Sequence, residues 1–198
     1  TATEPFTEEN GNSRNLPMMH RKSEILYGQN ETYASLLLPY GGAGRLWNMT
    51  VLLPNEGKTV DDVLASLHAD SWKERRDEMM PMLVDIKIPR FTTTSDNDLI
   101  NPIKALGAPM IFREDADFSK MCGKGKSVFV GMMRQKAAIE VNEKGTQATA
   151  VTLSGLVTAD MPNWEPEFVD FHANRPFVYV IQEMSSGAIF FIGTFRGA

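Results

Sequence analysis

The sequence EKGTQATAVT, residues 143–152, lies between two strand-like regions and guides the interpretation of the whole chain. It is too polar for a core strand, yet it is richer in Ala and Thr than a flexible Gly/Ser/Pro linker would be. Successive strand residues point to opposite faces. One face therefore carries only small side chains, namely Thr146, Ala148, Ala150, Thr152 and Ser154. We predict a segment that can insert as a strand between two strands of an existing sheet.

The regions on either side of this segment have strand patterns. Residues 127–142 precede it, and their last five residues alternate between apolar and polar. A loop over residues 153–167 follows, and then a short strand at 168–171. Residues 176–184 and 188–195 are expected to pair as a hairpin around Ser185-Ser186-Gly187.

The first half of the chain also contains strand patterns. We predict strands that begin at residues 16–19 and span 33–39, 47–53 and 83–91, whereas residues 1–15 show no pattern. The unbroken apolar runs 36–38 and 51–53 indicate strands that are covered on both faces. A glycine-rich turn at 40–44 joins two of these strands into a hairpin.

Four short helices complete the prediction. Thr59 is expected to cap the first, because Asp61 and Asp62 follow it in the first turn. A second helix is predicted over residues 71–80. A third is capped by Ser95 and ends at Gly107, and residues 115–119 form one turn. The fold class is therefore α+β with mostly antiparallel sheets.

Composition limits the possible functions. The 198 residues carry a formal charge of −5 and include no basic stripe, which argues against a nucleic-acid partner. No window is apolar enough for a membrane span, and a single cysteine, Cys122, excludes an internal disulfide. His20, His68 and His172 have no catalytic or metal-binding spacing, so we expect solvated or core roles, with no metal and no cofactor.

With these segments in order, the chain resembles the C-terminal half of a serpin. The likeness is carried by Leu16-Pro17-Met18-Met19, Met49-Thr50-Val51-Leu52-Leu53-Pro54, Ile88-Pro89-Arg90-Phe91, Leu106-Gly107 with Phe112, Ala116-Asp117-Phe118-Ser119, residues 141–146, Asn174-Arg175-Pro176-Phe177 and residues 189–193. Each motif is weak alone, but their common order along the chain is specific. The resemblance implies that residues 1–198 are the C-terminal part of a single serpin domain, with 143–167 as hinge and reactive-centre loop.

The resemblance implies a serine protease inhibitor that acts as a suicide substrate, not an enzyme. A target protease cleaves the loop and becomes acylated, and the loop then inserts into the large sheet as a new strand. The hinge positions of inhibitory members are matched by Glu143, Gly145, Thr146, Ala148, Ala150 and Thr152. Gln135 occupies a position beneath the sheet opening where many serpins carry His, and its amide can still donate and accept there.

The usual hinge spacing places the reactive bond between Ala159 and Asp160, with Val157 and Thr158 as neighbouring candidates. Counting back from Pro176 allows cleavage as far along as about Glu165. No Lys or Arg lies between Gly145 and Arg175, so an elastase-like or subtilisin-like serine protease fits better than a trypsin-like one, and a cysteine protease is a further candidate. The family's usual targets imply an extracellular or cell-surface location, with an intracellular one as the alternative.

The resemblance leaves out the family's N-terminal half. The chain is therefore expected to be a fragment, to be completed by another chain that supplies that half, or to be an inactive truncated product. A non-inhibitory serpin that acts as a carrier, chaperone or binding protein is the alternative function. Bulky or charged hinge residues would favour that alternative, and they are absent here.

Overall fold

The computed structural model describes residues 1–40, 46–123, 127–143 and 167–197, and of residues 69–71 only the backbone. The chain divides into two compact units. The first consists of Thr1–Phe91 together with Val141–Ala198, and the second of Thr92–Glu140.

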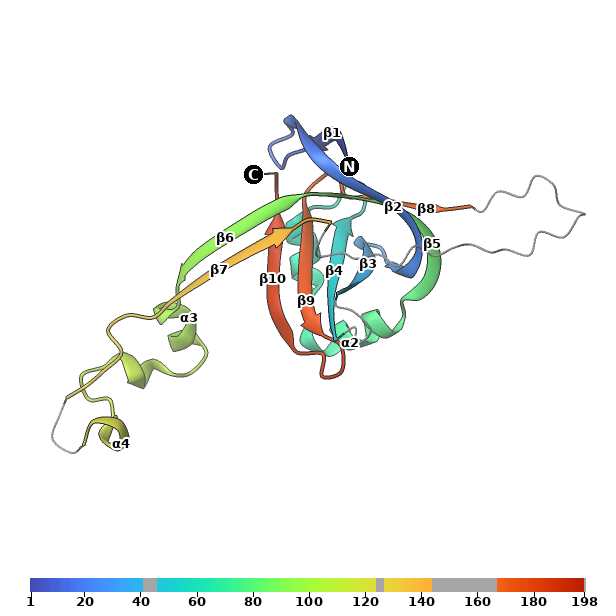
Figure 1. Cartoon of the computed structure of the whole chain (residues 1–198). Helices are drawn as coiled ribbons and strands as arrows, with labels where there is room; N and C mark the ends of the chain where they lie inside the picture. Colours follow the sequence, from blue (N-terminus) through green and yellow to red (C-terminus); the bar gives the residue numbers. More distant parts are fainter. Residues whose placement is uncertain (41–45, 124–126, 144–166, 198) are drawn as a thin grey trace, which may run out of the picture. The chain divides into compact units, whose positions relative to one another are not determined.

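The first unit is built around one large sheet (Figure 1). Its strands are β1 (Ala2–Thr7), β2 (Ser13–Gln29), β3 (Tyr33–Tyr40), β4 (Trp47–Pro54), β5 (Met80–Pro89), β8 (Val169–His172), β9 (Phe177–Glu183) and β10 (Ile189–Phe195). Its helices are α1 (Val60–Ser66) and α2 (Ala69–Asp77).

The strand order of this sheet is β10-β9-β4-β3-β2-β5-β8, and β1 pairs with β2 off this path. The long strand β2 links three other strands. Its first residues pair with β1, its middle with β5 and its last three residues with β3. Every registered pair is antiparallel except β5 with β8, which run parallel over four residues. The described residues thus confirm a mostly antiparallel sheet.

The core lies where strands β4 and β9 meet helix α1. Residues 48–54 of β4 are all buried, as the apolar run predicted. Tyr33, Leu52 and Val178 pack against Val60 and Val63 of α1. Helix α1 begins where the sequence indicated, because the Thr59 side chain accepts a 3.1 Å hydrogen bond from the Asp62 amide while the Asp62 carboxylate accepts one of 2.8 Å from the Thr59 amide.

Aromatic rings gather around Phe91 at the end of the first unit's N-terminal segment. The Phe91 ring lies 5.5 Å from that of Phe177 and 4.9 Å from that of Phe195. Phe6 of β1 joins this cluster with its ring 5.3 Å from that of Phe195, which ties the edge strand β1 to the last strand of the chain.

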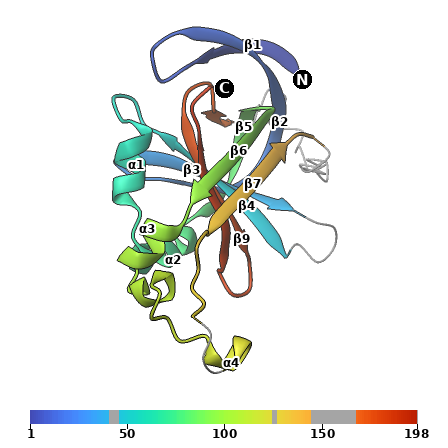
Figure 2. The same cartoon turned by 90° about the vertical axis from the view of Figure 1, so that its left-hand side faces the viewer.

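The second unit consists of a two-stranded ribbon with short helical turns. Strands β6 (Phe91–Asp98) and β7 (Arg134–Val141) pair with each other, and their first and last residues, respectively, belong to the first unit. Both views show the two strands side by side (Figure 1, Figure 2). The turns are α3 (Ile100–Ala105), the 3-10 helix η1 (Pro109–Phe112) and α4 (Ser119–Cys122). None of the described helices is long and apolar enough to cross a membrane.

Several predicted elements need correction. Residues 1–15 contain β1 and the start of β2, because pairing between Thr7 and Ser13 creates strands that their polar sequence does not signal. The third helix starts at Ile100 and not after Ser95, which lies in β6. The β-branched residues 92–94 favour the extended chain, and the Asp98 carboxylate accepts the 2.8 Å hydrogen bond from the Ile100 amide that starts the helix.

Two further boundaries were wrong. The strand predicted to begin near residue 127 starts at Arg134, and Gly131 interrupts the apolar run before it. The single turn predicted over 115–119 forms instead at Ser119–Cys122, where the Asp117 carboxylate accepts a 3.0 Å hydrogen bond from the Ser119 amide. The turn predicted at residues 40–44 lies mostly outside the described residues.

Candidate functional site

The predicted hinge begins directly after strand β7. Glu143 follows that strand by two residues and is the last described residue before 167. The other hinge residues Gly145, Thr146, Ala148, Ala150 and Thr152, and the reactive-bond candidates Val157, Thr158, Ala159 and Asp160, lie outside the described residues. Gln135 lies in β7 with an exposed side chain, and its predicted role beneath the sheet opening stays a prediction.

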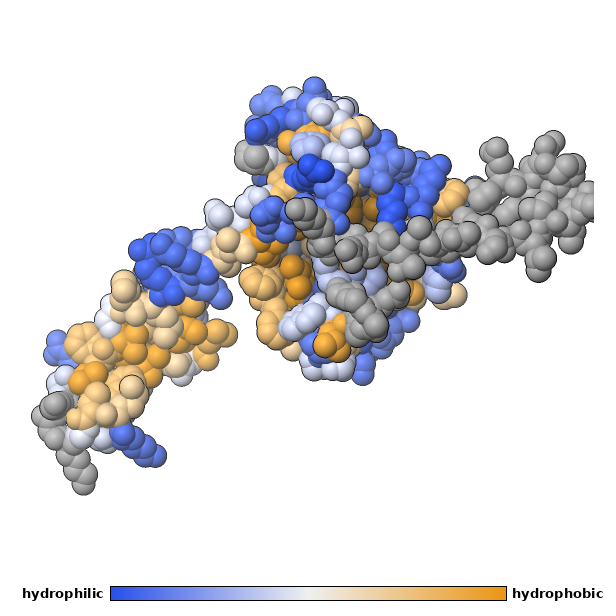
Figure 3. Space-filling model, viewed as in Figure 1, coloured by the Kyte–Doolittle hydropathy of each residue, from blue (hydrophilic) through white to orange (hydrophobic). Residues whose placement is uncertain are grey.

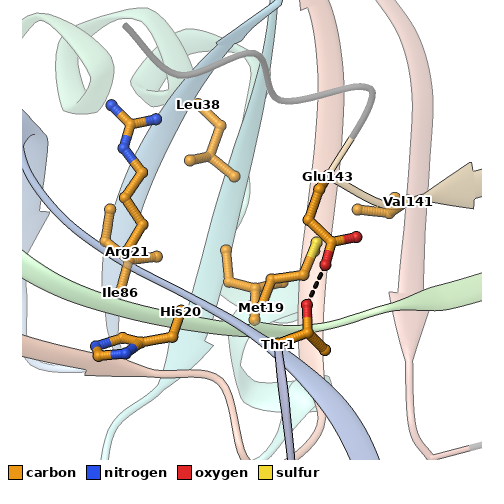
Figure 4. A pocket seen from close by; sticks show the side chains of 9 residues that line it. Thr1, Met19, His20, Arg21, Leu38, Ile86, Val141 and Glu143 are labelled. Carbon is orange, nitrogen blue, oxygen red and sulfur yellow. Dashed lines mark hydrogen bonds between the residues drawn. The ribbon is translucent and has the colours of Figure 1, made fainter. Parts of the chain in front are cut away.

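Arg90 holds the carboxylate of Glu143 with two hydrogen bonds. The Arg90 Nε atom donates to Oε2 over 2.6 Å, and Nη2 donates to Oε1 over 2.5 Å. The Thr1 hydroxyl donates a third hydrogen bond to Oε1 (Figure 4). Arg90 itself is fixed at the end of β5, because its backbone amide donates 2.8 Å to the carbonyl of Pro17 in β2. The paired bonds fix both the position and the orientation of the carboxylate.

These hydrogen bonds change the acidity of Glu143. The bonds from Arg90, and then that from Thr1, lower the pKa of the Glu143 carboxyl to about 2. The same contact raises the pKa of Arg90 above its ordinary value. Both side chains are nearly half exposed, 47% for Arg90 and 43% for Glu143, so solvent and salt weaken the attraction. The pair fixes the position of Glu143 more than it stabilises the fold.

A pocket of about 310 Å³ lies next to Glu143, which forms part of its lining. Apolar side chains from three strands of the large sheet and from β7 form much of its lining, namely Met19, Leu38, Ile86, Ile88 and Val141. The polar residues Thr1, His20, Arg21 and Glu143 complete it (Figure 4). This lining suits the packing of an apolar side chain.

A second polar cluster lies on the sheet around Asp85 of β5. Its Oδ1 atom is 2.7 Å from Nε2 of His20 in β2, and Oδ2 is 3.3 Å from Nζ of Lys22. Nε2 of His172 in β8 lies 3.5 Å from the same Oδ1. Burial alone would raise the pKa of Asp85, but hydrogen bonds from His20 and Lys22 outweigh it and the pKa is lowered. Asp85 thus joins three neighbouring strands.

Sequence reasoning missed both groups of contacts. Arg90 belonged to a quoted motif but received no role, and the histidines were treated as unrelated. The alternation of residues 84–88 already placed Asp85 on the polar face of β5. The partners could have been found only from strand register, which sets Lys22 opposite Asp85 on one side and Asp170 opposite it on the other.

The family model described as serpin, serine protease inhibitor, matches residues 1–197. The chain belongs to the serpin family. Its relatives include mouse glia-derived nexin, 32% identical over 98% of this chain, mouse neuroserpin at 32% over 98%, and wheat Serpin-Z2B at 29% over 98%. The chain spans about half the length of these relatives, between 47% and 50%.

Solved serpin structures have the same fold. The native-state crystal structure of the thermophilic serpin tengpin matches all of this chain and 50% of its own, with a TM-score of 0.81 and 26% identity. The crystal structure of native protease nexin-1 with heparin matches 99% of this serpin chain and 51% of its own, with a TM-score of 0.80 and 26% identity. The serpin fold predicted from the motifs is therefore confirmed, and the family is one of protease inhibitors in general.

Proposed function

We propose that this serpin chain carries the reactive-centre loop of a serine protease inhibitor that acts as a suicide substrate. The observation that carries this proposal is the run of small side chains after Glu143, on the face formed by Thr146, Ala148, Ala150 and Thr152. A strand that inserts between two others must bury one face, and a charged side chain there would cost several kcal/mol if it were left unpaired, on the order of a blocked insertion.

The proposed reaction stops after one bond exchange. The serine oxygen of the protease attacks the carbonyl carbon of Ala159, and the bond from that carbon to the nitrogen of Asp160 breaks. The nitrogen leaves as an amine after it takes up a proton, and an ester joins Ala159 to the protease. Insertion of the cleaved loop as a strand then carries the protease away and distorts its active site before water can release it.

The clamp between Arg90 and Glu143 supports this proposal. The chain leaves β7 at Val141, and the two hydrogen bonds from Arg90 fix Glu143 two residues later. With Glu143 held in place, residues 144–159 set how far the proposed reactive bond can lie from the end of β7. Gly145 supplies the backbone freedom where the loop must turn.

The target class follows from the residues around the bond. Small side chains at Ala159 and Thr158 suit elastase-like or subtilisin-like pockets, and the absence of Lys and Arg between Gly145 and Arg175 disfavours a trypsin-like pocket. A cysteine protease would form the equivalent thioester. From the family's usual targets we propose an extracellular or cell-surface location, with an intracellular one as the alternative.

The proposal also requires the other half of a serpin domain as a partner. Strand β10 exposes consecutive apolar side chains, with 49% of Ile189, 56% of Phe190, 39% of Phe191 and 56% of Ile192 accessible. Figure 3 shows hydrophobic surface over this strand. Contiguous exposed apolar surface marks an interaction site. We propose that a segment corresponding to the serpin N-terminal half covers it, and the full-length protein used in the tests below is the one that contains this half.

A gel test separates an inhibitor from a carrier. Full-length protein is mixed with elastase, subtilisin, trypsin or papain and analysed by SDS gel electrophoresis. We expect a band that survives SDS with elastase or subtilisin, which a non-inhibitory carrier would not give. Thr146→Arg should convert the inhibitor into a substrate, while Gln147→Arg, on the opposite face of the same segment, should keep the complex. Equal complex yields for the two variants would contradict the insertion proposal.

A further inference from the structure

In the polar cluster around Asp85, the His172 side chain makes contacts that are longer than ordinary hydrogen bonds. Nε2 of His172 lies 3.5 Å from Oδ1 of Asp85 and 3.8 Å from Oδ1 of Asp170. Within the part of the chain that the structure describes, this buried nitrogen has no partner at full hydrogen-bond geometry. A buried polar atom without a well-formed hydrogen bond costs free energy, so a nitrogen that makes only long contacts to two carboxylates calls for an explanation.

The spacing of these atoms fits a metal ion. Zn²⁺ binds imidazole nitrogen and carboxylate oxygen at about 2.0–2.2 Å in tetrahedral geometry, so two of its ligand atoms lie roughly 3.3–3.6 Å apart. The two distances from Nε2 of His172 are 3.5 Å and 3.8 Å, and the ligand atoms of Asp85, Asp170 and His172 all lie within 4.8 Å of one another. These separations are long for hydrogen bonds and near those of ligands that share an ion.

We propose that Asp85, Asp170 and His172 bind a divalent transition-metal ion of the Zn²⁺ type. The imidazole nitrogen favours such an ion over Ca²⁺ or Mg²⁺, which prefer all-oxygen sites. Zn²⁺ would take the lone pair of Nε2 and one oxygen from each carboxylate, which leaves a position for water. This site is independent of the protease chemistry proposed above.

The groups around the site permit this role. His20 lies 2.7 Å from Asp85 Oδ1 and can orient that carboxylate. The cations opposing metal binding are Lys22, 3.3 Å from Asp85 Oδ2, and Lys87, whose charge is paired with Glu4 at 2.7 Å. The Asp170 side chain is 75% exposed, so an ion can enter from solvent.

The ion would link two strands that share only a short ladder. Asp85 lies on β5, whereas Asp170 and His172 lie on β8, and the two strands pair over only four residues. Strand β8 is the first element described after residues 144–166. Zn²⁺ would therefore hold against β5 the strand that follows the predicted loop in the chain. Zn²⁺ should therefore slow hydrogen exchange at the amides of residues 169–173.

Calorimetric titration of the full-length protein with ZnCl₂ at pH 7.5 tests the proposal. Asp170→Asn should lower the Zn²⁺ affinity of one site by about tenfold or more, and His172→Gln should do the same. His68→Gln is the matched control, because His68 lies outside the cluster, and metal bound elsewhere contributes equally to every variant. Because Asp170 is exposed, its variant should fold even if His172→Gln does not.

Hydrogen exchange gives the second readout. Zn²⁺ should slow exchange in residues 169–173 of the wild type and of His68→Gln, but not of Asp170→Asn. Unchanged affinity in Asp170→Asn, or equal exchange in that segment with and without Zn²⁺, would overturn the proposal. The second result would mean that Asp85, Asp170 and His172 share no ion. Neither result bears on complex formation with proteases, so this inference fails or stands separately from the proposed function.

Discussion

Trp72 of helix α2 donates a 2.8 Å hydrogen bond from its indole Nε1 to the side-chain oxygen Oε1 of Gln182 in strand β9. Gln182 is fully buried, and its Nε2 atom has no hydrogen-bond partner within the described residues. The bond from Trp72 is therefore what satisfies the buried oxygen of Gln182. It also ties α2 to the sheet at the point where the Trp72 ring packs against the core.

Trp72→Phe should destabilise the fold measurably. The variant keeps an aromatic ring but leaves the Gln182 oxygen without its donor, which should lower the free energy of unfolding by about 1–3 kcal/mol. Urea unfolding followed by circular dichroism measures the change. The matched control is Trp47→Phe, because Trp47 is 37% exposed and contacts Phe190 through its ring. Equal losses in the two variants would show that the hydrogen bond contributes nothing.

The contact between Glu143 and Arg90 should make stability depend on acid pH. The folded state lowers the pKa of Glu143 to about 2 from an ordinary value of 4.5. A lowered pKa means that the stabilisation is fully present above pH 4.5 and disappears as the pH falls toward 2. The difference in unfolding free energy between wild type and Glu143→Gln should therefore be largest near neutral pH and shrink below pH 4.5.

The control for this acid effect is the same substitution made in a protein that lacks the Arg90 side chain. In an Arg90→Leu background, Glu143→Gln should give a smaller difference with a weaker pH dependence. High salt should also reduce the wild-type difference, because both side chains are solvent-accessible. A difference that is the same at pH 7 and pH 3 would mean that Arg90 does not hold the charge of Glu143.

Local signals in the sequence predicted local structure well. The cap at Thr59 was found because Thr59 and Asp62 form it within one turn. Burial of both faces of β4 followed from its apolar run. Strand β1 was missed because Phe6 is its one buried residue and its pairing with β2 leaves little trace in its composition.

Contacts between distant residues could not be read from the sequence in the same way. Glu143 was predicted to start the hinge, but Arg90 lies 53 residues earlier and is brought to it by the fold. His20 and His172 meet at Asp85 because β2, β5 and β8 lie in one register, and a single sequence does not give that register. The roles of the loop residues still rest on the family resemblance and their small side chains.

Replacement of the residue before the proposed bond should change the target protease. Ala159→Arg should form SDS-resistant complexes with trypsin and lose those with elastase, because the cleaved residue determines which pocket the loop fits. Mass spectrometry of the released C-terminal peptide should find Asp160 as its first residue in both proteins. A peptide that begins elsewhere would move the bond, for instance toward Val157 or as far as Glu165. Val157→Arg serves as the position control.

The most direct test is the melting temperature of full-length protein before and after cleavage of the loop between Gly145 and Asp160. If the small-sided face enters the sheet, the cleaved protein gains a strand, and its melting temperature should rise clearly above that of the intact protein. In Thr146→Arg the rise should be smaller or absent. An unchanged or lower melting temperature after cleavage of the wild type would contradict loop insertion and, with it, the proposed inhibitory mechanism.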